Sequence, residues 1–364
     1  MTQSESLQPD GPRREAILGL VMVNLLWGIS FPAMKATTLL LDRFVAPSAP
    51  GHPMATAVTQ ATSACFLISV RFGIALVILA VCVPALFRGL TWDKWRMGAL
   101  TGVAFSAGFV FQIVGLNYVP ASRSGFLTSL TVIFTPIAMT VIERKLPRWP
   151  VLAGVASALF GTAVLTGMCE FSPPFGIRIA AGAMSQIGPG DWCTIIAALI
   201  FTFQILLIDR FSRRMPAGQL TPGMFFATLG IGMLLFASGN LIKPPSRGTA
   251  VWGMLLVDWR FLALIAVMSV FCTVLAFHWM NKYQGHVTPA QAALIYTLEP
   301  IFATLWAMLL PGLISMTMDL DYPSERPGWE LVIGGLLVVA GNAMALLPDK
   351  RPSIRTESVS EAST

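Results

Sequence analysis

Long apolar runs separated by short polar connectors dominate the pattern along the chain. About 20 helical residues, rising about 1.5 Å each, cover the hydrocarbon core of a bilayer. Runs of about this length occupy residues 16–41, 64–87, 97–118, 124–142, 150–168, 192–209, 223–242, 260–281, 289–310 and 329–347. The pattern therefore predicts an all-α polytopic membrane protein with ten transmembrane helices.

The composition supports a membrane protein and argues against a nucleic-acid partner. Hydrophobic residues make up 55% of the chain and charged residues 12%, whereas soluble domains carry about 25% charged residues. The net charge is +6, but the basic residues are scattered through the connectors. That distribution is typical of membrane topology, and the expected partner is the lipid bilayer.

The placement of lysine and arginine predicts the orientation. If the N-terminus is inside, most of the 24 basic residues fall on cytoplasmic segments, as the positive-inside rule requires. We therefore expect a multi-pass protein of the cell inner (plasma) membrane with both termini in the cytoplasm.

Polar stretches define the expected boundaries. Residues 1–15 are predicted to be a disordered cytosolic tail, and residues 348–364 a second cytosolic tail. The loop 169–191 contains SPP and GPG and is predicted to be a periplasmic linker. It separates two halves, 16–168 and 192–347, of five spans each. An odd number of spans reverses the direction of the next half, so a duplicated unit would form an inverted repeat.

Short similarities between the halves support this duplication. The fourth span contains SRSGFLTSLTVIFTP and the ninth TPAQAALIYTLEP, which places Pro136 opposite Pro300. Proline removes a helix donor and clashes with the preceding turn, so both prolines are predicted to mark helix breaks. Interrupted spans at corresponding positions in two halves point to the binding site of a transporter.

A carboxylate near the centre of the ninth span, Glu299, is the sharpest candidate for function. A charge at the bilayer centre costs at least about 2.5 kcal/mol on insertion scales, so Glu299 is expected to face a cavity or packed protein. It could bind a substrate amine, or exchange a proton because burial favours the neutral form of a carboxyl group. Equally, it could stabilise the electropositive start of the following half-helix.

Two cations also lie inside predicted spans. Lys35 and Arg71 could balance Glu299 or hold a substrate carboxylate. Alternatively, each could extend its side chain to the headgroups, which is the favoured interpretation for Arg71.

Polar and aromatic residues near mid-membrane predict a cavity wall. Asn24, Trp27 and Ser30 have helical spacing on the first span and can share one face. Together with Lys35 and Glu299, the predicted substrate-binding set is completed by Phe111, Gln112, Thr128, Thr131, Phe203, Gln204 and Tyr296. For each of these residues, packing between helices is the alternative role.

Four stretches resemble the EamA-like drug/metabolite transporter superfamily. They are LLWGISFPAMKA (25–36), VRFGIA (70–75), SGFLTSLTVIFTPIAMTVIERK (124–145) and NKYQGHVTPAQAALIYTLEPIFATLWAMLL (281–310). The resemblance implies ten helices in two inverted repeats, a central cavity and export of small metabolites such as amino acids. The ninth span departs from the pattern, because no acidic residue at its end corresponds to Glu143 at the end of the fourth span.

The remaining chemistry narrows the function. The five cysteines and three histidines have no metal-ligand or redox spacing, so no metal or cofactor is expected. No P-loop is present. The sequence therefore predicts a secondary transporter of a small-molecule substrate that acts as an exporter by alternating access. It would be a monomer or homodimer, with proton coupling as one option. A passive channel or facilitator, or an intramembrane lipid-modifying enzyme, is the alternative.

Overall fold

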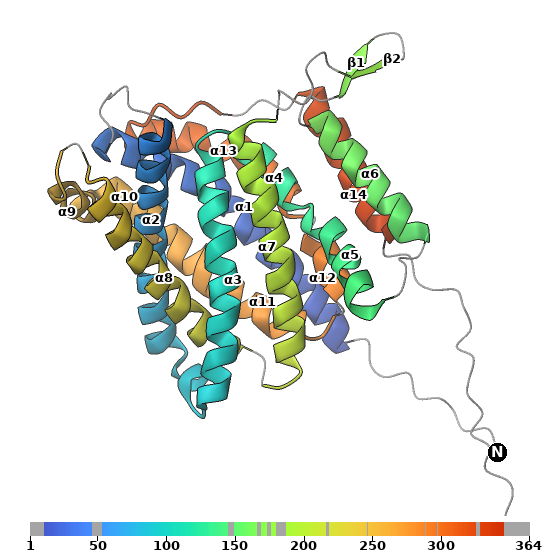
Figure 1. Ribbon diagram of the computed structural model, residues 1–364, viewed down its shortest axis with the longest axis horizontal. Helices are drawn as coiled ribbons and strands as arrows, with labels where there is room; N and C mark the ends of the chain where they lie inside the picture. Colours follow the sequence, from blue (N-terminus) through green and yellow to red (C-terminus); the bar gives the residue numbers. More distant parts are fainter. Residues whose placement is uncertain are drawn as a thin grey trace, which may run out of the picture.

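Helices form nearly all of the described chain in the computed structural model, apart from one short β-hairpin (Figure 1). The structure describes residues 11–45, 53–144, 149–165, 169–172, 176–179, 187–215, 218–245, 247–287, 289–296, 298–324 and 328–345. The first half of the chain contains α1 (Gly11–Val45), α2 (Pro53–Cys82), the 3₁₀ turn η1 (Pro84–Phe87), α3 (Trp92–Leu116), α4 (Ala121–Thr128), α5 (Thr131–Glu143) and α6 (Trp149–Leu165).

The hairpin and the second set of helices follow. Strands β1 (Cys169–Ser172) and β2 (Gly176–Ile179) pair antiparallel, with Cys169 opposite Ile179. The helices are α7 (Pro189–Ser212), α8 (Leu220–Ile242), α9 (Ala250–Val257), α10 (Trp259–Val267), the π-helix η3 (Met268–Leu275), α11 (Ala276–Gln284), α12 (Pro289–Tyr296), α13 (Glu299–Met318) and α14 (Trp329–Ala345). The hairpin lies within the stretch 169–191, for which the sequence predicted only a linker.

Seven of the described helices are long and apolar enough to cross a membrane. They are Arg14–Val45, Val58–Cys82, Trp92–Leu116, Pro189–Ser212, Leu220–Ile242, Trp259–Gln284 and Ile301–Met318. Shorter apolar helices occupy Thr131–Ile142, Leu152–Gly161 and Val332–Gly341. Large apolar side chains such as Phe226, Leu234 and Leu241 of α8 are exposed, as expected of a lipid-facing surface. The prediction of a helical polytopic membrane protein is confirmed.

The N-terminal helix is longer than the sequence predicted. α1 begins at Gly11, inside the stretch 1–15 that was predicted to be a disordered tail. Pro12 is compatible with this start, because a proline in the first helical turn gives up an N–H that has no intrahelical partner. Residues 1–10 and the predicted tail 348–364 lie outside the described residues.

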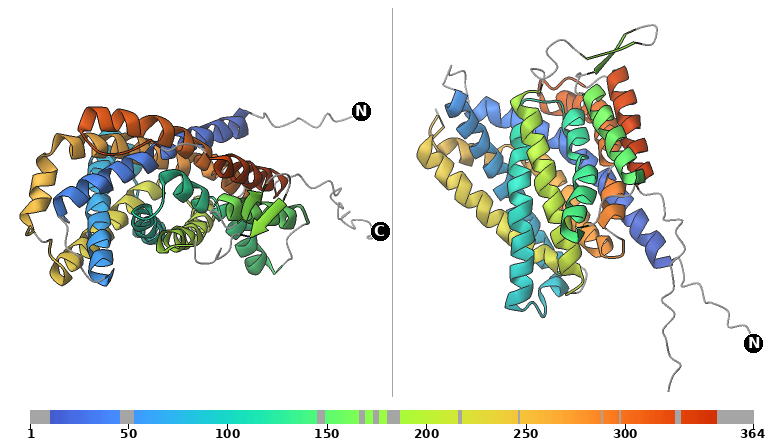
Figure 2. Two further views of the ribbon diagram at one scale, coloured as in Figure 1. Left: turned by 90° about the horizontal axis from the view of Figure 1, so that it is seen from above. Right: turned by 45° about the vertical axis from the view of Figure 1, so that its right-hand side comes forward.

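Small residues allow close packing between helices in two places. A Cβ on Gly223 of α8 would lie 2.9 Å from the Trp95 carbonyl oxygen and 3.0 Å from the Gly98 Cα of α3. A Cβ on Gly341 of α14 would lie 2.5 Å from the Gly154 carbonyl oxygen of α6. Helices α6 and α14 form a pair at one side of the bundle (Figures 1 and 2).

The prediction that Pro136 marks a helix break is wrong. α4 ends at Thr128 and α5 begins at Thr131, so the helix is interrupted before the proline, which lies inside α5. Pro136 loses only the bond to the carbonyl four residues earlier, and membrane helices tolerate this loss when neighbours surround them. Pro300 does lie at a break, in the first positions of α13, where a missing N–H has little consequence.

Candidate functional site

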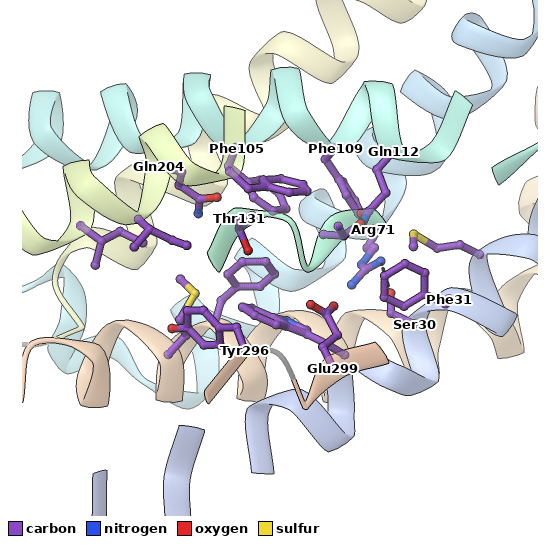
Figure 3. A pocket seen from close by; sticks show the side chains of 18 residues that line it. Ser30, Phe31, Arg71, Phe105, Phe109, Gln112, Thr131, Gln204, Tyr296 and Glu299 are labelled. Carbon is purple, nitrogen blue, oxygen red and sulfur yellow. Dashed lines mark hydrogen bonds between the residues drawn. The ribbon is translucent and has the colours of Figure 1, made fainter. Parts of the chain in front are cut away.

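A cavity lies among α1, α2, α3, α4, α5, α7, α11, α12 and α13, with about 670 Å³ free of protein atoms, including the part open to the surroundings. Three helices line it with residues at helical spacing, namely Trp27, Ser30, Phe31 and Met34 of α1, Phe105, Phe109 and Gln112 of α3, and Phe201, Gln204, Ile205 and Ile208 of α7 (Figure 3).

Eight of the residues selected from sequence line this cavity. They are Trp27, Ser30, Gln112, Thr128, Thr131, Gln204, Tyr296 and Glu299. Thr128 and Thr131 lie on either side of the interruption between α4 and α5, and Tyr296 and Glu299 on either side of that between α12 and α13. Both interrupted helices thus contribute their broken region to one cavity.

Four residues of the predicted set lie outside the cavity lining. The Nδ2 of buried Asn24 donates to the Leu20 carbonyl at 2.6 Å. The Lys35 ammonium donates to the carbonyl of Leu116, at the end of α3. Phe111 and Phe203 are 37% and 55% exposed.

Helical geometry explains why the two phenylalanines miss the cavity. Adjacent residues in an α-helix point about 100° apart, whereas residues three, four or seven apart share a face. Phe111 therefore cannot share the inward face of its neighbour Gln112, which Phe105 and Phe109 do share. On α7, Phe201 lies on the face of Gln204 and Phe203 does not. The missed phenylalanines could have been found from this spacing.

The interpretation that Arg71 extends to the headgroups is wrong. Arg71 is 1% exposed and lines the cavity. Its Nε donates to the Thr273 hydroxyl at 2.5 Å, and its Nη2 donates to the Cys272 carbonyl at 3.2 Å. Its Nη1 donates to the Ser30 hydroxyl at 3.0 Å. These acceptors lie on α1 and on the π-helix η3, and they hold the guanidinium at mid-helix depth.

The π-helical segment gives Arg71 two of its partners. In η3 the Thr273 hydroxyl donates to the carbonyl of Met268, five residues earlier, at 2.8 Å. The Ser269 hydroxyl donates to the backbone carbonyl of Arg71 at 3.1 Å. A π-helical stretch inside an α-helix is uncommon and often accompanies a functional site. Nothing in the local sequence predicts it.

Glu299 is the first residue of α13, and its carboxylate extends into the cavity (Figure 3). Within the described part of the chain this carboxylate has no hydrogen-bond or ion-pair partner. The predicted alternative, capping of α13, is limited to a charge–dipole contribution, because the N-cap is Leu298 and no side-chain hydrogen bond caps the helix. The carboxylate is therefore available to a ligand.

Aromatic rings build much of the rest of the wall. The Trp27 ring centroid lies 5.3 Å from that of Phe277 and 5.5 Å from that of Tyr296. The Tyr296 hydroxyl donates to Gln284 Oε1 at 2.9 Å, and Gln284 Nε2 donates to the Ile205 carbonyl at 3.3 Å. Among the described residues, the cavity thus combines aromatic walls with the cation of Arg71 and the carboxylate of Glu299, a set that suits binding of a charged amphipathic solute.

Comparisons with known proteins agree with this architecture. Residues 51–167 match the model of the EamA-like transporter family. A protein of Archaeoglobus fulgidus described as an uncharacterized transporter is 28% identical over 330 residues, which cover 90% of this chain and 86% of the relative. The chain is therefore similar to EamA-like transporters, most clearly over residues 51–167. Its long apolar helices are those of a multi-pass membrane protein.

The similarity to a solved crystal structure supports the fold and nothing further. That structure matches this chain with a TM-score of 0.53 and 19% identity, and the match covers 92% of this chain and 97% of the other. The residues matched by the family model include Arg71, Gln112, Thr128 and Thr131 of the cavity, whereas Glu299 and α1 lie outside them.

Proposed function

We propose that this chain is an EamA-like protein that acts as a secondary transporter and exports small metabolites, such as amino acids, across the inner (plasma) membrane. The observation that carries the proposal is the unpaired Glu299 carboxylate in a cavity among apolar helices. Ionisable groups inside membrane segments are costly, and they usually mark substrate or ion pathways. Alternating access around this cavity would carry the solute across, with Glu299 binding a substrate amine or exchanging a proton.

The proposed architecture is ten spans in two inverted five-helix repeats, 16–168 and 192–347, with both termini in the cytoplasm. Reciprocal packing supports it. α4 packs against α13 as α5 packs against α12. In such a repeat α1 would correspond to α7, α2 to α8, and α3 to the segment that contains η3 and α11. Accordingly, α1 packs against α11 as α7 packs against α3. In the same way, α2 packs against η3 as α8 packs against α3. Two copies of one unit related by an axis in the membrane plane would produce these pairs.

Transport by reconstituted protein tests the proposed role of Glu299. Proteoliposomes containing the wild type should accumulate a radiolabelled amino acid when a pH gradient is imposed. Glu299→Gln keeps the shape of the side chain and removes its charge, so we expect it to abolish pH-driven accumulation. Asp209→Asn is the matched control, since Asp209 pairs with Arg213 near the end of α7 and does not line the cavity.

The other outcomes separate the alternatives. Unchanged pH-driven accumulation by Glu299→Gln would remove Glu299 from the mechanism. Downhill flux in the wild type that ignores pH would favour a facilitator. A chemical change in the lipid, detected by mass spectrometry, would favour an enzyme.

Labelling of the chain termini tests the repeat. Epitope tags on the two ends should both be accessible only from the cytoplasmic side of inside-out vesicles. Tags on opposite sides would overturn the proposed inverted duplication, because ten spans return the chain to the side on which it began.

A further inference from the structure

Arg71 is a permanent positive charge inside a membrane-spanning helix. Its side chain is 1% exposed, and an arginine guanidinium is not deprotonated in proteins. Among the residues that the structure describes, no carboxylate lies within ion-pair distance of it. Charges this deep in a membrane are normally paired or face a solute pathway, and Arg71 lines the cavity.

The groups that hold Arg71 are all neutral. Its hydrogen-bond acceptors are the hydroxyls of Thr273 and Ser30 and the carbonyl of Cys272, with the Met268 sulfur a weak contact at 3.9 Å. A guanidinium has five N–H donors, and oxygen atoms accept from three of its nitrogens. These partners fix the position of the guanidinium without neutralising its charge.

On the cavity side, no carboxylate of the described residues forms an ion pair with Arg71. The Phe109 ring centroid lies 5.1 Å from the guanidinium carbon, and a cation over a ring gains only part of the energy of an ion pair. Glu299 extends into the same cavity (Figure 3), but the two groups form no ion pair. Arg71 and Glu299 thus line one cavity without neutralising each other.

We infer that Arg71 receives the anionic group of the transported solute and selects solutes that carry one carboxylate. Arginine suits this role because its planar fork matches a carboxylate bidentately. Glu299 in the same cavity disfavours a second negative charge, so the remainder of the solute would be neutral or cationic. This inference rests on the proposed transport function and names the substrate class of that cavity.

The competing explanation is that Arg71 only holds helices together. It connects α2 to Ser30 of α1 and to Thr273 and Cys272 of η3. A purely structural role predicts that replacing Arg71 weakens the binding of every solute to the same extent. An anion site predicts a loss confined to solutes that carry a carboxylate.

A matched set of probes separates these explanations. We choose 3-phenylpropionate, L-phenylalanine and phenethylamine, which share an aromatic body suited to the rings of Trp27 and Phe105. Purified full-length protein in nanodiscs would be titrated with each probe by calorimetry. The wild type should bind the two carboxylate probes at least about tenfold more tightly than phenethylamine, because only they can pair with a guanidinium.

Three variants complete the experiment. Arg71→Gln should abolish the preference for a carboxylate, and Arg71→Lys should keep part of it, since lysine retains the charge but not the fork. Asp209→Asn, at a residue that does not line the cavity, is the control and should leave the order of the probes unchanged. If Arg71→Gln does not fold, the wild-type order and Arg71→Lys decide the question.

Several outcomes would overturn the inference. A wild type that binds phenethylamine as tightly as the acids would contradict an anion site, and so would a wild type that binds neither acid. An equal loss of affinity for all three probes in Arg71→Lys would also contradict it. Binding is measured without a gradient or transport. A failure of pH-driven transport would therefore contradict the proposed function without deciding this result.

Discussion

Leu130 and Leu298 occupy equivalent places in the two interrupted helices. The backbone N–H of Leu130 donates to the carbonyl of Leu127 at 3.2 Å, and that of Leu298 donates to the carbonyl of Ile295 at 3.1 Å. Each leucine thus closes a tight turn of the 3₁₀ type after an eight-residue helix, α4 in one case and α12 in the other. The same local structure therefore forms from two different sequences.

The next helices begin with the same contact. The Leu130 carbonyl accepts from the Phe134 N–H at 3.0 Å, and the Leu298 carbonyl accepts from the Phe302 N–H at 3.1 Å. In this register LTSLTVIF of α4 and α5 corresponds to IYTLEPIF of α12 and α13, and Thr131 corresponds to Glu299. One half of the protein therefore supplies a hydroxyl where the other supplies a carboxylate.

This register corrects the alignment on prolines. In it Pro300 corresponds to Val132, whereas the sequence comparison placed Pro300 opposite Pro136. The two alignments differ by four residues, which is about one helical turn, so the face of the helix is nearly preserved.

The first prediction concerns packing of α8 on α3. A Cβ at Gly223 would lie 2.9–3.1 Å from backbone atoms of Trp95, Gly98 and Ala99, whereas a Cβ at Gly230 of the same helix would meet nothing within 4 Å. Gly223→Ala should therefore destabilise the protein by about 1–3 kcal/mol. Gly230→Ala should be neutral or slightly stabilising, because alanine favours helix. Thermal unfolding of the purified variants measures both, and equal midpoints would contradict the prediction.

The second prediction concerns the Tyr296 hydroxyl. Removing it in Tyr296→Phe leaves the oxygen of buried Gln284 without its donor, so we expect a loss of about 1 kcal/mol in the free energy of unfolding. Tyr118→Phe is the matched control, because Tyr118 is 47% exposed and its hydroxyl bonds Gln60 at the surface. Denaturant titration should show a smaller effect for the control; similar losses would argue against the buried bond.

The sequence was sufficient for the class of fold and for much of the cavity. Apolar runs define spans because lipid imposes a length, and the spacing of Trp27 and Ser30 identified an inward face of α1. For α3 and α7 the sequence identified one polar residue on each helix, Gln112 and Gln204, but one residue does not give the rotation of a helix. The sequence prediction therefore chose Phe111 and Phe203, which are adjacent to these glutamines in sequence, and missed Phe109 and Phe201, which share the inward helix face.

Arg71 shows a different limit of sequence reasoning. Its acceptors Ser30 and Thr273 lie 41 and 202 residues away along the chain, and one of them is on a π-helix that no local pattern indicates. A lone arginine in an apolar run is therefore compatible with a headgroup position until its partners are known. Lys35 is similar, because its acceptor, the Leu116 carbonyl, is supplied by the distant end of α3.

The third prediction concerns the ion pair that joins α4 to the start of α7. Arg123 Nε lies 2.8 Å from Asp191 Oδ1, and the Asp191 side chain is only 3% exposed. Asp191 Oδ2 also accepts from the Gly188 N–H at 3.0 Å. Arg123→Met leaves a buried carboxylate without its cation and should lower the free energy of unfolding by about 2–3 kcal/mol.

A double-mutant cycle isolates the pair. Adding Asp191→Asn to Arg123→Met removes the stranded charge, so the two losses should be less than additive, with a coupling of about 1–3 kcal/mol. The exposed pair Asp209–Arg213, at 3.2 Å, is the matched control and should couple by about 0.3–0.5 kcal/mol. Strictly additive losses at Arg123 and Asp191 would show that the ion pair does not contribute to stability.

The last prediction concerns Asp258, which precedes α10. Its Oδ1 accepts from the Arg260 N–H at 2.8 Å and its Oδ2 from Arg260 Nη2 at 2.7 Å. Hydrogen bonding to the Arg260 side chain holds the pKa of Asp258 below its ordinary value. A depressed pKa means that the ionised carboxylate stabilises the fold above the unfolded pKa of about 3.9. This contribution is lost as the pH falls through the lower, folded pKa.

Two variants separate the cap from the charge. Asp258→Ala removes both and should lower the free energy of unfolding by about 0.5–2 kcal/mol. Asp258→Asn can still cap α10, so its loss should be smaller. The difference in thermal midpoint between wild type and Asp258→Asn should stay constant from pH 7 to about pH 4 and shrink below it, as the wild-type carboxyl is protonated. A difference that persists unchanged at the lowest pH would mean that the charge of Asp258 does not stabilise the fold, and that only the shape of the side chain matters at this helix end.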